Sequence, residues 1–123
     1  MLFRSTENAD LTLTDVTPRN DGLDFTLTYK GETLAVTTPI AGVFQAENIA
    51  LAAAMCLAGG IPFKQLRIGL EALVAPVGRM EQVASSPKGV ACYVDYAHTP
   101  DALKTALMAL RPHCKGRLIC VFG

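Results

Sequence analysis

Residues 90–110 join an apolar strand to an amphipathic helix through a short polar corner, and this junction restricts the folds open to the chain. Residues 90–94 (VACYV) are continuously apolar and β-rich, which is typical of a strand covered on both faces. Thr99 is a good N-cap, Pro100 suits the first helical position, and Asp101 adds negative charge in the first turn. Apolar residues then recur at helical spacing until Pro112 ends the helix. The junction predicts an α/β fold.

The polar corner carries two side chains that can contact a ligand. Asp95 ends the strand and His98 precedes the helix. Open α/β sheets bind ligands beyond the carboxyl ends of their strands. A carboxylate there can accept two hydrogen bonds from a ribose diol, but it can equally cap local amides. For His98 a capping or packing role is the simpler interpretation, and His113, beside Cys114, is most simply solvated at the end of a helix.

The N-terminal part of the chain has the pattern of antiparallel strands. Leu11 and Leu13 alternate with threonines before a turn-prone segment at residues 18–22. Residues 25–30 and 33–37 also alternate, and they predict a hairpin with one apolar face.

Two helices are expected next. The first covers residues 45–58, is apolar almost all round and is therefore expected to be buried, with glycines 59–60 ending it. The second begins at Pro62, presents leucines 66, 70 and 73 on one face, and closes at residues 75–76.

A domain boundary is predicted between residues 77 and 78. Beyond it, strands are expected at residues 80–84, 90–96 and 117–122, the last completing a β-α-β unit. This part has about 45 residues, which is below the size at which one core usually suffices. We therefore expect a fragment that holds the end of one domain (1–77) and the start of another (78–123).

The composition narrows the class of protein. Eleven acidic and eleven basic residues give a net charge of zero, and no basic run favours nucleic acid as a partner. The four cysteines lack Cys-x-x-Cys spacing, so reduced thiols are favoured over a zinc site or disulfides. No signal peptide or membrane-spanning segment is recognisable, which predicts a soluble, cytoplasmic chain.

Three segments, in order, resemble the Mur ligases, the ATP-dependent amide-forming enzymes of peptidoglycan synthesis. Residues 95–103 (DYAHTPDAL) resemble the signature of the family and are most similar to the branch that adds the third peptide residue. Residues 78–81 (GRME) resemble the junction between its central and C-terminal domains. Residues 42–48 (GVFQAEN) resemble its Gly-x-Phe-Asn-x-x-Asn element. The resemblance implies the end of a central ATPase-type domain, followed by the first β-α-β part of a Rossmann-like domain.

The resemblance also implies ATP-binding roles for three residues, each with an alternative. Asn48 would lie near adenine, although its amide could instead bond a loop carbonyl. Arg79 would contact the phosphates, although it could instead be a surface arginine paired with Glu81. Asp95 would bind the ribose. Gln45 stands where the family has an asparagine, and its side chain is longer. The resemblance therefore supports an ATP-binding role less directly for Gln45, and also for His98, than for the three residues above.

The implied reaction joins a diamino acid, diaminopimelate or lysine, to UDP-N-acetylmuramoyl-L-alanyl-D-glutamate through an acyl phosphate. The family's phosphate loop, carbamylated lysine and Mg²⁺ ligands have no counterpart in this sequence, so neither a catalytic residue nor a metal ligand is expected within it. The chain alone is expected to be inactive. The alternatives are a non-catalytic nucleotide-binding or interaction module, and another ligase of the superfamily such as a cyanophycin or folylpolyglutamate synthetase.

Overall fold

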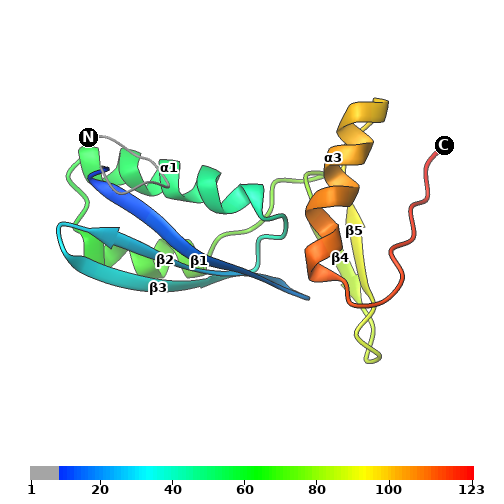
Figure 1. The fold of residues 1–123 in the computed structure, drawn as a ribbon, viewed down its shortest axis with the longest axis horizontal. Helices are drawn as coiled ribbons and strands as arrows, with labels where there is room; N and C mark the ends of the chain where they lie inside the picture. The colour runs from blue at the N-terminus through cyan, green and yellow to red at the C-terminus, as the bar shows by residue number, and fades with distance from the viewer. Residues whose placement is uncertain (1–8) are drawn as a thin grey trace.

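The computed structural model describes residues 9–123 and has the expected mixed α/β character (Figure 1). A first unit contains a three-stranded sheet and two helices, and a second unit contains a two-stranded sheet and one helix. Among residues 9–123, no helix combines the length and apolar character needed to cross a membrane.

The first unit is an antiparallel meander of β1 (Leu11–Arg19), β2 (Gly22–Tyr29) and β3 (Glu32–Thr38) in the order β1-β2-β3. Because side chains alternate along a strand, one face of this sheet collects the apolar residues. Leu27 pairs with Leu13 on one side and with Leu34 on the other, and all three are buried. The predicted hairpin is confirmed, with Lys30 and Gly31 both at positive φ as a tight primed turn requires.

Two helices complete the core of the first unit. Helix α1 (Phe44–Ala58) contributes a stripe of small residues and Ile49, and helix α2 (Leu66–Glu71) contributes Leu66 and Leu70. A short 3₁₀ turn, η1 (Phe63–Gln65), precedes α2. The helix predicted from Pro62 to residue 75 is therefore shorter than expected.

Helix α1 is not buried all round, contrary to expectation. Its inner face packs on the sheet, whereas Phe44, Leu51 and Met55 on its outer side are 42%, 50% and 69% exposed. One side of α1 packs on the sheet, so the opposite side faces solvent.

The second unit begins with the hairpin β4 (Glu81–Ser85) and β5 (Ala91–Val94), which pair antiparallel. Helix α3 (Pro100–Leu110) follows, and a 3₁₀ turn, η2 (Arg111–His113), continues from it. The Thr99 hydroxyl accepts a hydrogen bond from Ala102 N–H, 3.2 Å away, which confirms the predicted N-cap.

The strand expected at residues 117–122 is absent from the described chain. This segment has no regular structure, and Ile119, Val121 and Phe122 are 70%, 93% and 79% exposed. A parallel strand forms only beside a hydrogen-bonded neighbour, and within residues 9–123 this segment pairs with no strand, β5 being paired with β4 alone. The β-α-β unit is accordingly present only as its first strand and helix.

Gly22 generates a stability prediction, because it opens β2 at φ +154° directly against β3. A Cβ there would lie 1.9 Å from the Thr38 carbonyl oxygen. We expect Gly22→Ala to lower the free energy of unfolding by roughly 3 kcal/mol, through backbone strain and overpacking. Gly31→Ala is the matched control, since its φ is +81° but its Cβ would meet nothing within 4 Å; we expect a loss of about 1 kcal/mol. Equal losses in urea denaturation would contradict the steric argument.

Candidate functional site

Asp95 lies directly after β5 and binds the backbone on two sides. Its Oδ2 accepts a hydrogen bond from Met80 N–H, and its Oδ1 accepts one from Ala97 N–H, both at 2.9 Å. The carboxylate thereby joins the corner after β5 to the residue before β4. These bonds match the local-capping alternative, yet each carboxylate oxygen retains a second lone pair that can accept from a ligand.

Arg79, Tyr96 and His98 form a short column beside Asp95. The Arg79 guanidinium carbon lies 5.4 Å from the centre of the Tyr96 ring, a cation–π distance. The His98 ring lies edge-on to Tyr96 at 5.0 Å between centroids, and its Nδ1 is 2.9 Å from the Tyr96 carbonyl oxygen. Contact with the face of the Tyr96 ring thus orients the exposed Arg79 guanidinium.

The loop before β4 holds Arg79 in a bent backbone. Gly78 and Met80 on either side have φ of +68° and +49°. Arg79 N–H donates to the Pro76 carbonyl oxygen at 3.0 Å, and Gly78 N–H donates to Glu81 Oε2 at 2.8 Å. Glu81 therefore binds the backbone of this loop, and the alternative ion pair with Arg79 does not occur among residues 9–123.

Asn48 and Gln45 lie in the first turns of α1, which begins at the end of the first unit that faces the second unit (Figure 1). The Asn48 side-chain N–H donates to Gln45 Oε1 at 2.9 Å, and Asn48 is exposed. The alternative partner, a loop carbonyl, is therefore not used. Within the described chain, Arg79 and His98 both contact Tyr96, and Asp95 binds the backbone of the residue next to each of them, whereas Asn48 and Gln45 form a separate pair.

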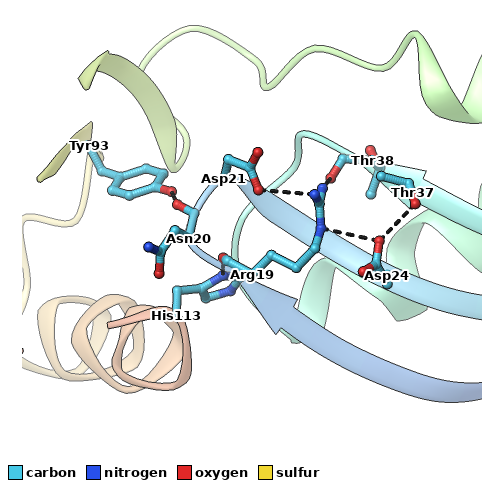
Figure 2. Close-up of polar contacts among 8 residues, drawn as sticks. All are labelled: Arg19, Asn20, Asp21, Asp24, Thr37, Thr38, Tyr93 and His113. Carbon is cyan, nitrogen blue, oxygen red and sulfur yellow. Dashed lines mark hydrogen bonds and ion pairs between the residues drawn. The ribbon is translucent and has the colours of Figure 1, made fainter. Parts of the chain in front are cut away.

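Two further residues, neither assigned a function from the sequence, connect the units (Figure 2). The Tyr93 hydroxyl donates to the Asn20 carbonyl oxygen at 2.9 Å. The two ring nitrogens of His113 lie 2.5 Å from the Arg19 carbonyl oxygen and 3.0 Å from the Gly42 amide nitrogen. His113, expected to be solvated at a helix end, is only 5% exposed. Its neighbours are 71 and 94 residues away in sequence, so no local pattern indicated this contact.

A cleft of about 500 Å³ lies beside β4. It is lined by Pro39, Val74, Ala75 and residues 81–85, next to the linker between the units. None of Asn48, Arg79 and Asp95 lines it. Among residues 9–123, no group of three or more His, Cys, Asp or Glu side chains is placed to hold a metal ion.

Comparison with known proteins shows similarity along nearly the whole chain. It is 44% identical over 117 residues, 95% of its length, to a UDP-N-acetylmuramoyl-L-alanyl-D-glutamate–2,6-diaminopimelate ligase of Caulobacter vibrioides. Over 88 residues it is 51% identical to the enzyme of the same name from Coxiella burnetii. Residues 78–123 match the family described as Mur ligase, glutamate ligase domain. The chain belongs to the Mur ligase family.

Solved structures agree with this assignment. A UDP-N-acetylmuramoyl-L-alanyl-D-glutamate–2,6-diaminopimelate ligase superposes with a TM-score of 0.75 and 31% identity, over 90% of this chain and 23% of that one. Folylpolyglutamate synthetase from Lactobacillus casei, at 23% identity and a TM-score of 0.66, shares the fold. This Mur ligase chain spans about a fifth to a quarter of the length of the curated relatives it matches.

Tyr93 generates a prediction about alkaline pH. Burial, and secondarily the negative charge of Asp21, raise the pKa of the Tyr93 phenol above its ordinary value of 10.0. Above pH 10 the unfolded chain therefore releases this proton before the folded chain does, so the stability of the fold falls as pH rises towards the folded-state pKa. We expect Tyr93→Phe to reduce that fall and to remove, from an absorbance titration, a phenol ionisation that lies above the ordinary pKa of 10.0. Tyr29→Phe is the control; loss of that high-pH ionisation in the Tyr29 variant instead would contradict the assignment.

Proposed function

We propose that this chain supplies part of the ATP site of a ligase that joins 2,6-diaminopimelate to UDP-N-acetylmuramoyl-L-alanyl-D-glutamate in the cytoplasm. The observation that carries the proposal is 44% identity, over 95% of the chain, to an enzyme of that name. The arrangement of Arg79 and Asp95 around one corner supports it, because a cation and an acceptor side by side suit a nucleotide's phosphate and ribose.

We assign the residues as follows. Asn48, assisted by Gln45, reads the adenine edge; Asp95 accepts from the ribose hydroxyls; Arg79 binds the phosphates, with His98 supporting the Tyr96 ring beneath it. The domain boundary lies between residues 77 and 78, so the nucleotide is held between the two units. The backbone bends at Gly78–Met80, in the loop that leads from the first unit into the second.

The side chains present fit a nucleotide. Among residues 9–123, the exposed Arg79 guanidinium contacts only an aromatic face, so its planar donors are available for paired bonds to phosphate. The exposed Asn48 amide can exchange its Gln45 bond for a base edge. Mg²⁺ has no ligand set among residues 9–123, so we assign no step of the reaction to a metal held by this chain.

In the proposed reaction, the γ-phosphoryl group of ATP is transferred to the substrate carboxylate, forming an acyl phosphate and ADP. The amine of the diamino acid then attacks the acyl carbon, forming an amide and releasing phosphate. Such chemistry depends on orientation and on neutralising the charge that develops on the oxygens. The share of this chain is to orient ATP and to place the Arg79 charge at its phosphates. Groups that hold the acceptor lie elsewhere in the enzyme.

Arg79 provides the first test of the proposal. In the complete enzyme, we expect Arg79→Ala to lower kcat/KM for ATP at least about tenfold, because charge-assisted phosphate contacts are lost. Arg79→Lys should restore activity only in part, since an ammonium group cannot form the paired contacts. Arg67→Ala is the control, because Arg67 is an exposed arginine that pairs with Glu71 on α2. Unchanged steady-state kinetics in Arg79→Ala would remove Arg79 from the site.

Asp95 provides a test that separates ribose binding from local capping. In the complete enzyme, we expect Asp95→Asn to weaken binding of ATP more than of 2′-deoxy-ATP, because the deoxy analogue already lacks one donor. Calorimetry on the four combinations gives a coupling energy. A value within about 0.3 kcal/mol of zero would mean that Asp95 and the 2′-hydroxyl are independent. Asp95 would then be only the cap that binds Met80 N–H and Ala97 N–H.

A further inference from the structure

Two side chains of the second unit bind consecutive carbonyl groups of the first (Figure 2). Tyr93, on β5, donates to the Asn20 carbonyl, and His113, on η2, contacts the Arg19 carbonyl. His113 also reaches the Gly42 amide, just before α1. The second unit thus contacts the first at the β1–β2 turn and at the segment that leads to Gln45 and Asn48.

The β1–β2 turn that receives these bonds is braced within its own unit. The Arg19 guanidinium lies 3.1 Å from both Asp21 Oδ1 and Asp24 Oδ1, and its Nη2 is 3.5 Å from the Thr38 carbonyl oxygen. Thr37 in turn donates to Asp24 Oδ1 at 2.8 Å. Because these bonds fix the turn to its own strands, a side chain that binds the turn carbonyls is held in a defined position relative to the sheet.

The partners of His113 determine which ring nitrogen carries the proton. The Gly42 amide can only donate, so Nε2 accepts from it, and the Arg19 carbonyl can only accept, so Nδ1 donates to it. The ring is therefore the neutral Nδ1–H tautomer. Both of its polar atoms are used across the boundary between units, which is the arrangement that a buried imidazole needs.

We propose that His113 and Tyr93 are positioning residues that lock the second unit onto the first, and thereby fix the placement of Arg79 and Asp95 relative to Asn48. We call these two side chains the interdomain clamp. Its effect on ATP rests on the nucleotide roles proposed above, whereas the clamp itself stands on the contacts of Asn20, Arg19 and Gly42. Through its bond with Gly42 N–H, His113 also orients the segment that enters α1.

The clamp is tested first in the 123-residue chain by NMR. We expect a scalar coupling across the hydrogen bond between the Gly42 amide nitrogen and His113 Nε2, together with the Nδ1–H tautomer. Residual dipolar couplings from the two units should fit a single alignment. An Nε2–H tautomer, or two different alignments in the unmodified chain, would overturn the clamp whatever the chain binds.

Variants then test whether these two side chains hold the two units in one relative orientation. Tyr93→Phe removes only the hydroxyl, and His113→Phe keeps a ring without nitrogens; each should give the two units separate alignments. His113→Gln, whose amide can again reach Gly42, should restore part of the common alignment. Tyr29→Phe is the matched control, because that ring packs on Phe63 within the first unit. A single alignment retained in Tyr93→Phe and in a folded His113→Phe would overturn the proposal.

The complete enzyme tests the positioning role. We expect Tyr93→Phe, which loses one hydrogen bond, and His113→Phe, which loses two, to raise KM for ATP about three- to tenfold, with kcat changed less than about twofold. His113→Gln should recover part of the loss. Unchanged KM alongside separated alignments would overturn the positioning role and leave the nucleotide roles intact. If instead Arg79 and Asp95 variants bind ATP normally while the NMR couplings are present, the nucleotide proposal fails and the clamp remains.

Discussion

The placement of the second unit depends on a few directional polar contacts, because this unit buries very little apolar surface. Within residues 78–123, the buried apolar side chains are Met80 and Ala109, whereas the first unit has a continuous core of strand and helix residues. Non-directional burial therefore cannot fix the orientation of the hairpin and α3. Hydrogen bonds can, since each constrains both distance and angle. The bonds of Tyr93 and His113 supply this constraint.

The sequence predicted the fold best where local signals and packing agree. The alternation in β1, β2 and β3 and the Thr99 cap follow from chemistry within a few residues, whereas the turn between β2 and β3 lies at Lys30–Gly31, one residue before the expected position. The prediction failed at residues 117–122, whose apolar pattern is that of a strand. A strand also requires a neighbour, and pattern alone does not reveal whether the described chain provides one.

The candidate site was likewise predictable only where residue type and local position carried the signal. Residue type and position after a strand singled out Asp95, and the family resemblance indicated Arg79 and Asn48. The Tyr96 ring beneath Arg79 and the two bonds of Asp95 required coordinates. His113 was misinterpreted because a histidine beside Cys114 at the end of a helix carries no local sign of burial. Its environment is created by the β1–β2 turn, far away in the sequence.

The outer side of α1 and the irregular C-terminal segment have a consequence for handling this chain. Phe44, Leu51 and Met55, together with Ile119 and Phe122, present apolar side chains to water from both units. Attraction between such surfaces strengthens on warming and in salts such as sulfate. Cold, sulfate-free and phosphate-free buffers should therefore keep the chain monodisperse, whereas salting-out steps should drive its self-association.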